Sequence, residues 1–308
     1  MSVKFDARMR EWREQIDANL KKTIELSAYP ADFREVLDYA VFPGGKRLRP
    51  ILFLEWHSLF APPGQAALDF ACGLELMHCF SLIHDDMPCI DNDDMRRGKP
   101  TVHKKYGEGK ALLAGDALLD MAYNCMMNAC FAAGNGNPFY FYRLCGENGI
   151  IHGEYLDVYG KCRSIEDLIS MYKKKTGAII ECACAVGYLF AQKFDVKSIL
   201  PVTWLENGKP LIEYIEGMTD DERTNVKLIG GALRFGESFG IAFQLYDDLS
   251  EYVAGEKSDG TTVMDYIDLD EAKKLLNHYL NGAISVLDSG YNGNTEYLRE
   301  LTEKFVIV

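Results

Sequence analysis

The 308-residue sequence lacks several features that would place it in other classes of protein. No apolar run approaches the roughly 20 residues that a helix needs to cross a bilayer, so we expect no membrane span. The first residues form neither the apolar core of a signal peptide nor an Arg- and Ser-rich transit peptide, which predicts a cytoplasmic protein. No basic domain or stripe is present and the net charge is −13, which argues against nucleic acid as a partner.

A cysteine pattern typical of metal or redox sites is also missing. The nine cysteines include no Cys-x-x-Cys pair. Cys182 and Cys184 lie two positions apart, a spacing that suits neither a zinc knuckle nor a thioredoxin-like site. We therefore interpret all nine as reduced structural thiols.

Alternating strand patterns between Gly or Asn turns are absent, whereas helical periodicity is nearly continuous. Apolar residues recur at three- and four-residue spacing over residues 70–83, 111–132, 168–190 and 229–253. Because residues 111–132 are apolar on most faces, we expect them to form a central helix. We predict one all-α domain over residues 1–308, a helical bundle around a central cavity. Helix-start pairs support this prediction: Ser164 with Asp167, Thr219 with Glu222, and Asp268 with Glu271.

The most informative segment is residues 84–98, in which five carboxylates fall within ten positions directly after an apolar run. Pro88 should loosen the helix end, so that Asp91 can return toward Asp85 and Asp86. Clustered carboxylates suit Mg²⁺, which binds a few carboxylates together with substrate phosphates. The segment therefore predicts metal and phosphate binding, with a solvated acidic loop as the alternative.

Two basic segments offer donors for the same phosphates. Arg96 and Arg97 follow the carboxylates and present forked donors to phosphate oxygens. Within residues 44–50, two glycines permit close backbone approach, and Lys46 and Arg49 point the same way from a helix start. An ordinary basic helix entry is the alternative for the second segment.

A second acidic motif and a lysine cluster are weaker signals by themselves. Asp247 and Glu251 are four residues apart and Asp248 and Glu251 three apart, so all three can share one helix face. Like charges so placed are destabilising without a cation, which indicates either metal ligands or surface charge. The lysines of residues 173–177 form either a surface turn or a phosphate contact.

In this order the segments resemble the trans-isoprenyl diphosphate synthases, of farnesyl and geranylgeranyl type, from about residue 36 to residue 251. The motifs are Gly-Gly-Lys-Arg-Leu-Arg-Pro, Asp-Asp-x₄-Asp with Arg-Arg-Gly, Lys-Thr-Gly and Phe-Gln-x-x-Asp-Asp. The resemblance implies a Mg²⁺-dependent short-chain prenyltransferase that condenses isopentenyl diphosphate with an allylic prenyl diphosphate. It also implies a homodimer, with the two acidic motifs facing each other across one pocket.

The resemblance further implies a role for each matching residue. Isopentenyl diphosphate would be held by Lys46, Arg49, His78 and Arg97. The allylic diphosphate would be contacted by Arg96, Lys175, Thr176 and Gln244. Mg²⁺ would be bound by Asp85, Asp86, Asp91, Asp247 and Asp248, with Glu251 as a sixth candidate. The five aspartates and Lys175 are the predicted catalytic residues.

Product length should depend on the helix wall before the first motif. Phe80 and Ser81 lie five and four residues before Asp85, about one helical turn away and facing the growing chain. An aromatic there resembles farnesyl-type members, so we expect a C15 product, with C20 next and C10 as a further alternative. Plain core packing of Phe80 is the competing interpretation.

Three departures from the family pattern keep other functions open. Glu251 stands where the family usually has aspartate, residues 255–262 are short with only Lys257 as a phosphate contact, and residues 195–217 form an unusual insert. A class I terpene cyclase or a non-head-to-tail coupling enzyme on the same scaffold is one alternative. A non-catalytic partner subunit of a synthase is another, although such a subunit would be expected to lose aspartates from the first motif.

Overall fold

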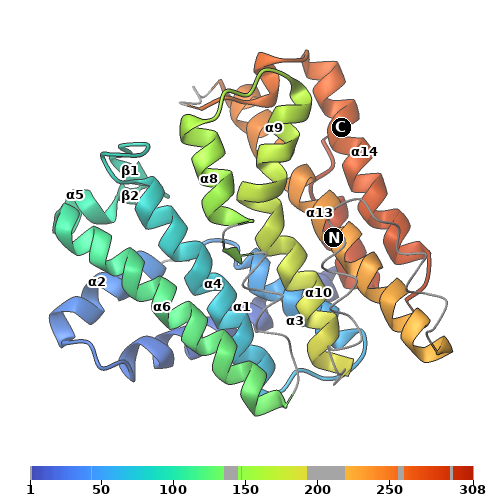
Figure 1. The fold of residues 1–308 in the computed structure, drawn as a ribbon, viewed down its shortest axis with the longest axis horizontal. Helices are drawn as coiled ribbons and strands as arrows, with labels where there is room; N and C mark the ends of the chain where they lie inside the picture. The colour runs from blue at the N-terminus through green and yellow to red at the C-terminus, as the bar shows by residue number, and fades with distance from the viewer. Residues whose placement is uncertain are drawn as a thin grey trace. The chain divides into compact units, whose positions relative to one another are not determined.

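The computed structural model describes residues 2–42, 44–134, 145–146, 148–192, 219–255, 260–291 and 294–307. Within these ranges the regular structure is helical apart from one two-stranded hairpin, which confirms the predicted fold class (Figure 1). The chain divides into two compact units: Met1–Leu54 with Gly64–Ala129, and Glu55–Pro63 with Cys130–Val308. The predicted insert at residues 195–217 and Lys257 lie outside the described residues.

In the first unit, helix α4 packs against several other helices. The elements of this unit are α1 (Val3–Glu25), α2 (Ala31–Val41), the start of α3 (Leu48–Ser58), α4 (Gln65–Asp85), β1 (Met95–Arg96), β2 (Lys99–Pro100), α5 (Val102–Tyr106) and most of α6 (Glu108–Ala133). Both α1 and α2 pack against α4. Gly73 lets α6 approach α4, since a Cβ there would lie 2.5 Å from the Met126 side chain and 2.9 Å from the Ala122 carbonyl oxygen. The helix that ends in the first acidic motif is thus held on several sides.

Helix α4 is long and apolar enough to span a membrane by length and composition. The expectation that no run reaches this length is therefore wrong. In its most apolar window 67% of the residues are buried in the structure, which is the behaviour of the core helix of a globular unit.

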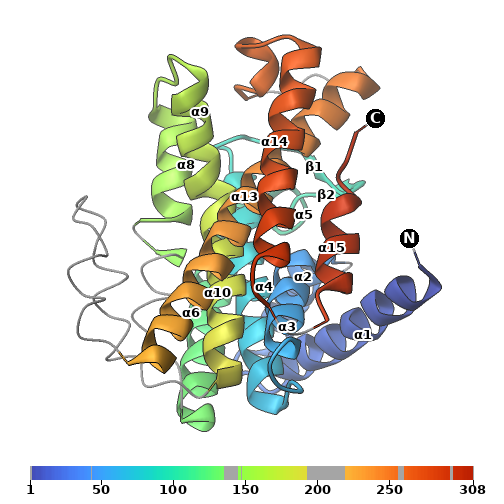
Figure 2. The same cartoon turned by 90° about the vertical axis from the view of Figure 1, so that its right-hand side faces the viewer.

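The second unit is a set of helices around α13. Its elements are α8 (Ile150–Tyr159), α9 (Ile165–Tyr172), η1 (Lys173–Gly177), α10 (Ala178–Gln192), α13 (Asp220–Ala254), η4 (Val263–Asp265), α14 (Leu269–Asp288) and α15 (Glu296–Glu303). Helix α13 packs along α10 and along α14 (Figure 2). Two predicted caps are confirmed: Ser164 Oγ accepts from the Asp167 amide at 3.3 Å, and Asp268 Oδ1 from the Glu271 amide at 2.9 Å. The third predicted start also fits, because α13 begins at Asp220, directly after Thr219.

Helices α9 and α10 continue into each other through η1, a single π-helical turn. Glycines on α13 permit close packing there. A Cβ at Gly240 would lie 2.6 Å from the Gly177 Cα, and one at Gly236 would lie 2.5 Å from the Glu181 Cα. A π turn inside an α-helix frequently marks a functional site, and this one contains the predicted Lys175 and Thr176.

The most buried helix differs from the predicted one. Residues 178–190 of α10 are all buried, whereas α6 leaves Leu113 59% and Phe131 73% exposed. The expectation that residues 111–132 form a central helix is therefore wrong. Apolar composition alone cannot separate a helix buried on all faces from one that leaves some of its apolar side chains in solvent. All nine cysteines are free, and Cys182 and Cys184 are buried in α10.

Candidate active site

The predicted basic residues of the first unit gather around the turn that precedes α3. Lys46 is exposed, and Arg49 is partly buried. The Arg97 guanidinium lies against the turn, since a Cβ at Gly45 would fall 2.6 Å from its Nη2 atom. A side chain at position 45 would therefore have to displace the Arg97 guanidinium. The hairpin β1–β2 delivers Arg97, whose φ of 53° is in the left-handed region.

His78 on α4 joins this basic cluster. Desolvation, together with the positive charges of Arg49, Arg97 and Arg96, holds the pKa of His78 well below its usual range. The ring is therefore neutral near pH 7 and can donate one hydrogen bond without adding charge. The structure thus brings Arg49, His78 and Arg97 together, with Lys46 on the same turn.

The first acidic motif forms a tight turn at the end of α4. The helix ends at Asp85, and the Asp91 amide donates to the Asp85 carbonyl oxygen at 2.9 Å, which confirms that the chain returns as predicted. Asp85 and Asp86 are buried. Burial raises the pKa of Asp86 to about 6, although its ion pair with Arg96 (Nε–Oδ1 2.5 Å) lowers it.

The carboxylates that follow α4 differ in their partners and in their exposure to solvent. Arg96 pairs with Asp86 and also with Asp93, at 3.3 Å from its Nη2 atom. Asp94, next in the chain, points outward, with its side chain 70% exposed and 2.6 Å from Lys104. The carboxylates of this run are therefore unequal: those at the helix end are buried, and Asp94 is a surface ion-pair partner.

In the second unit, Lys175 is held by two carboxylates that the sequence did not single out. Its Nζ lies 2.8 Å from Glu154 Oε2 and 2.5 Å from Asp157 Oδ2, both on α8. The backbones meet closely, because a Cβ at Gly153 would fall 2.2 Å from the Lys175 amide nitrogen. The spacing of Glu154 and Asp157, three residues apart on one helix face after a glycine, is the signal that could have found them.

Asp248 is the centre of a buried hydrogen-bond network. Its Oδ1 accepts from Gln244 Nε2 at 3.1 Å, and its Oδ2 accepts from the Val263 amide at 3.0 Å and from the Tyr172 hydroxyl. Gln244 in turn accepts from Thr176 Oγ1 at 3.0 Å. Burial raises the pKa of Asp248 even though these donors lower it. The predicted residues Thr176, Gln244 and Asp248 are thus connected directly, and Tyr172 is a member that the sequence did not reveal.

The other carboxylates of the second motif are more accessible. Asp247 is half-buried and Glu251 is exposed, whereas Asp248 is buried. The three carboxylates on α13 therefore differ in their exposure to solvent. That the two acidic motifs face one pocket stays a prediction.

The predicted length-determining residues lie on α4 in the first unit. Phe80 is 6% exposed, and its ring meets His84 edge-on with centroids 5.8 Å apart. Ser81 is partly buried and its hydroxyl donates to the His78 carbonyl oxygen at 3.0 Å. His84 rests on α6, since a Cβ at Gly115 would fall 2.1 Å from its ring.

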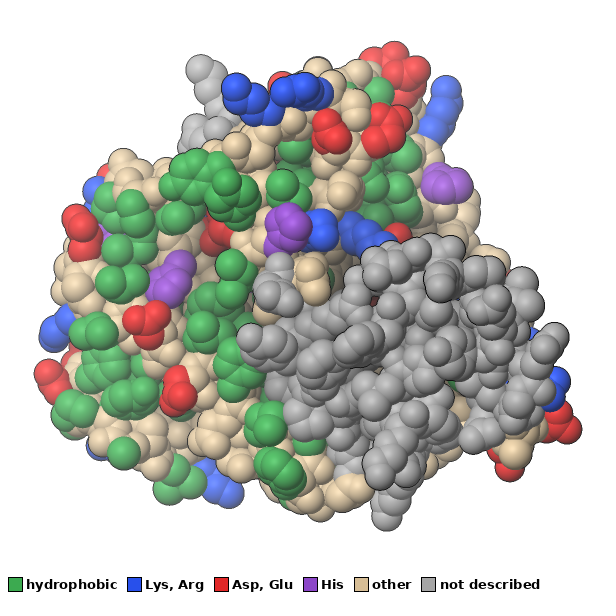
Figure 3. All heavy atoms as spheres, viewed as in Figure 1, with side chains coloured by type: hydrophobic (Ala, Val, Ile, Leu, Met, Phe, Trp, Pro, Cys, Tyr) green, Lys and Arg blue, Asp and Glu red, His purple; other side chains and the backbone are tan. Residues whose placement is uncertain are grey.

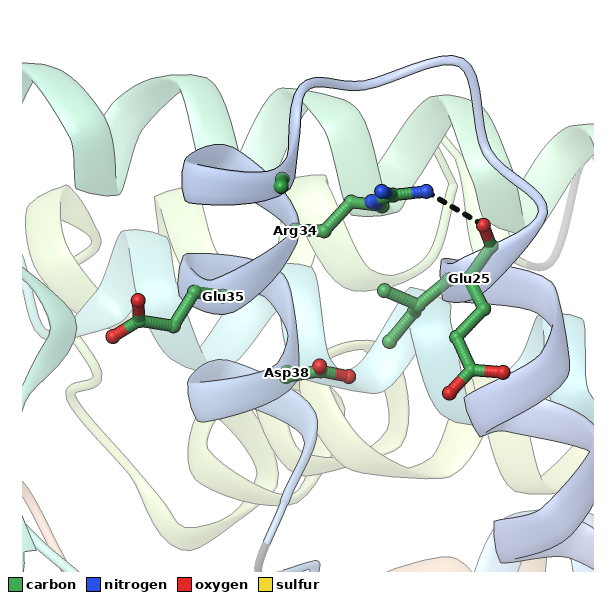
Figure 4. Close-up of a pocket in the computed structure, with 6 residues that line it drawn as sticks. Glu25, Arg34, Glu35 and Asp38 are labelled. Atoms are coloured by element: carbon green, nitrogen blue, oxygen red, sulfur yellow. Dashed lines mark hydrogen bonds between the residues drawn. The ribbon is translucent and has the colours of Figure 1, made fainter.

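A cavity of about 430 Å³ lies elsewhere in the first unit, beside α1 and α2 (Figure 4). It is lined by Ile24, Glu25, Ala31, Arg34, Glu35 and Asp38, none of which is a predicted site residue. Arg34 donates to the Glu25 carbonyl oxygen at 2.7 Å, and Asp38 pairs with Lys21 at 2.6 Å. The cavity therefore carries none of the predicted chemistry.

Comparison with known proteins places the chain in a family. The model of the polyprenyl synthetase family matches residues 30–203. The chain belongs to this family. A farnesyl diphosphate synthase of Micrococcus luteus is 30% identical over 276 residues, which cover 84% of this chain and 84% of that protein.

Other relatives are longer or are known from solved structures. The large subunit 2 of a heterodimeric geranylgeranyl pyrophosphate synthase of Arabidopsis thaliana is 31% identical over 85% of this chain. The chain spans only 63% of that protein, and 57% of two other plant geranylgeranyl pyrophosphate synthase chains. A crystal structure of an FPP/GFPP synthase from Zymomonas mobilis matches the whole of both chains with a TM-score of 0.77 and 25% identity.

The turn at the end of α4 fits a divalent metal by the chemistry of its donors. Asp85, Asp86 and Asp91 offer only carboxylate oxygens, the ligands that Mg²⁺ prefers. A cation would also favour the ionised form of Asp86, whose pKa is raised by burial. Among the described residues, no three His, Cys, Asp or Glu side chains are already arranged as a metal site.

The close contact of α8 with the π turn gives a testable prediction. Gly153→Ala should lower the free energy of unfolding by about 1–3 kcal/mol, since the new Cβ meets backbone rather than a movable side chain. Urea unfolding measures the change. Gly109→Ala is the control, because nothing lies within 4 Å of a Cβ there, and it should be neutral or slightly stabilising. Equal stability of the two variants would contradict the packing described here.

Proposed function

We propose that this polyprenyl synthetase is a short-chain trans-prenyltransferase that condenses isopentenyl diphosphate with an allylic prenyl diphosphate. The observation that carries the proposal is the juxtaposition, within one unit, of a basic cluster and a carboxylate turn. Arg97 contacts the Gly45 turn, while its neighbour Arg96 pairs with Asp86. Cationic donors beside clustered carboxylates suit a diphosphate that is bound partly through metal ions.

The two diphosphates would be held by different groups. We assign isopentenyl diphosphate to Lys46, Arg49, His78 and Arg97. We assign the allylic diphosphate to Arg96, Lys175, Thr176 and Gln244. In the structure the Lys175 ammonium is paired with Glu154 and Asp157, so binding of a diphosphate there would compete with these carboxylates.

Mg²⁺ would be held by Asp85, Asp86 and Asp91 and by Asp247, Asp248 and Glu251. Bound there, it would act as a Lewis acid on the leaving diphosphate. Both oxygens of Asp248 already accept hydrogen bonds, and its side chain is buried. We therefore expect Asp247, half-buried at the preceding position, to be the better ligand on α13.

The chemistry needs stabilised charge rather than a nucleophilic side chain. Breaking the allylic carbon–oxygen bond leaves an allylic cation and a diphosphate anion. The lysine and arginine donors stabilise the negative charge that develops on the leaving group. The double bond of isopentenyl diphosphate then supplies the electrons for the new carbon–carbon bond, and the departing diphosphate accepts the proton that is lost. Apolar walls would exclude the water that would otherwise trap the cation.

We propose farnesyl diphosphate as the main product and geranylgeranyl diphosphate as the next candidate. Phe80→Ala should lengthen the main product by at least one five-carbon unit, because it removes a ring one turn before Asp85. Mass spectrometry of dephosphorylated products measures this. Leu26→Ala, which truncates an exposed leucine just after α1, should leave the product unchanged. A loss of stability without a longer product would show that Phe80 serves only core packing.

The deciding experiment is an incubation with isopentenyl diphosphate and dimethylallyl, geranyl or farnesyl diphosphate in turn, with Mg²⁺ and with EDTA. Products are analysed by mass spectrometry before and after phosphatase treatment. We expect linear C15 or C20 alcohols that appear only after phosphatase and only with Mg²⁺. Hydrocarbons formed without isopentenyl diphosphate would indicate a cyclase, and no turnover in any mixture would indicate a partner subunit.

A homodimer is also proposed. The support is the exposure of three apolar side chains on α6: Leu112 and Leu113 near its start and Phe131 near its end are 49%, 59% and 73% exposed. Hydrophobic side chains gather on the corresponding face of the molecule (Figure 3). Patches of this kind often mark protein–protein contacts. Sedimentation equilibrium should give twice the chain mass of 34.7 kDa, and a monomer at micromolar concentration would contradict the proposal.

A further inference from the structure

Arg47 lies between Lys46 and Arg49 in the chain, but it points into the protein. Its side chain is buried, and each of its three guanidinium nitrogens has an acceptor. Nε donates to Asp17 Oδ1 at 2.8 Å, Nη1 to Glu75 Oε1 at 2.7 Å, and Nη2 to the Val41 carbonyl oxygen at 3.0 Å. These groups come from α1, from α4 and from the end of α2. Arg47 therefore connects three helices of the first unit at the predicted diphosphate site.

The backbone at Arg47 adopts a conformation that side chains other than glycine seldom take. Its φ is 51°, in the left-handed region. Such a conformation persists only where the surroundings determine it, and the buried ion pairs of Arg47 do so here. Gly44 belongs to the same arrangement, because a Cβ there would fall 1.9 Å from the Arg47 guanidinium carbon.

The ion pair with Glu75 fixes the turn against the helix that carries His78. Glu75 and His78 are three residues apart on α4, so they lie on neighbouring positions of one helix face. The next glycine of the turn, Gly45, receives the Arg97 guanidinium. A shift of the turn would therefore move Lys46 relative to both His78 and Arg97.

We infer that Arg47 is a positioning residue for the isopentenyl diphosphate site. It holds the Gly44–Arg49 turn in register with α4 through Glu75 and Asp17, and it makes no contact with the substrate itself. The left-handed conformation at Arg47 sends Lys46 to the surface while the Arg47 side chain enters the core. This inference rests on the proposed function, in that it assumes which diphosphate the turn binds.

The inference predicts a selective kinetic defect. Loss of the contacts of Arg47 with Glu75 and Asp17 displaces Lys46 and Arg49. A displacement of about 1 Å in a positioned group can lower the reaction rate on the order of 10²-fold. We expect Arg47→Lys to raise the KM for isopentenyl diphosphate at least about ten-fold. The KM for the allylic substrate should change less than about two-fold, because its proposed contacts do not involve this turn. Arg34→Lys is the control, since the Arg34 guanidinium donates to the Glu25 carbonyl oxygen beside the cavity at α1 and α2, and it should leave both values unchanged.

A double variant separates positioning from a purely structural role. Arg47→Gly accommodates the left-handed backbone but leaves the Glu75 carboxylate buried without its cation, so it should lower the melting temperature. Adding Glu75→Gln removes that buried charge and should recover much of the stability. If Arg47 positions the turn, the KM for isopentenyl diphosphate stays high in the double variant. A KM that returns to the wild-type value together with stability would overturn the inference.

A binding measurement keeps this test independent of the proposed activity. Calorimetric titration with inorganic pyrophosphate in EDTA reports the basic cluster without metal ions. We expect wild-type protein and Arg34→Lys to bind it, and Arg47→Lys and the double variant to bind at least about ten-fold more weakly. If the wild type shows no turnover but these differences in pyrophosphate affinity are found, only the proposed function is rejected. Equal pyrophosphate affinities in folded wild type and variants would reject the role of Arg47.

Discussion

Replacing Asp85 by asparagine is expected to lower kcat by about 10²–10³-fold, with little change in folding. Asp85 is the last residue of α4, and its carbonyl oxygen receives the Asp91 amide that closes the acidic turn. Asparagine leaves this backbone contact in place but removes one negative charge from the proposed metal ligands. The effect should appear in steady-state turnover with saturating substrates, and circular dichroism should be unchanged.

The same run of aspartates offers a matched control. Asp94 lies nine positions after Asp85, and its side chain is 70% exposed beside Lys104. Since an exposed ion pair contributes little, Asp94→Asn should keep kcat within about two-fold of the wild type. Wild-type activity of both variants would show that the turn does not bind the metal ions of the reaction. Comparable losses in both would show a general dependence on the acidity of the loop.

Replacing Asp248 by leucine is expected to lower the free energy of unfolding by about 3–5 kcal/mol. The carboxylate is buried and accepts from Gln244, from the Val263 amide and from the Tyr172 hydroxyl. Leucine is of similar size but accepts no hydrogen bond, so three donors would be left without this partner. Chemical denaturation measures the loss.

Asp248→Asn separates hydrogen bonding from charge. The amide oxygen can still accept hydrogen bonds, although its NH₂ group faces a donor, so the expected loss of stability is about 1–2 kcal/mol. If Asp248 also binds a metal ion, Asp248→Asn should in addition lower turnover, whereas Tyr172→Phe should affect mainly stability. Full stability of Asp248→Leu would contradict the network described here.

Helices, their caps and the acidic turn could be predicted from the sequence, because each depends on residues close together in the chain. The periodic apolar runs correspond to α4, α6, α13 and the continuous run from α9 to α10. The caps at Ser164 and Asp268 involve groups three residues apart, so their geometry follows from the helix itself. The return of Asp91 to Asp85 was also predictable, because Pro88 cannot continue the helix.

Long-range partners were not predictable in this way. In the sequence Glu75 is a single carboxylate within an apolar run, and its partner Arg47 lies 28 residues away. Tyr172 and Asp248 are 76 residues apart, and Lys175 meets Asp157 across 18. No periodicity or spacing relates such residues, because the contacts exist only once helices have packed.

The sequence by itself determined the helical class, the acidic turn and the family, since each depends on residue types at short, fixed spacings. Only the tertiary structure decided which charged side chains are buried in ion pairs or hydrogen bonds and which are exposed. Of the adjacent basic residues at the start of α3, Lys46 is exposed and Arg47 is buried between two carboxylates. Of the paired aspartates on α13, Asp247 is half-buried while Asp248 forms a buried network. The physical reason is that burial and pairing set the charge and reach of a side chain, and both come from helix packing.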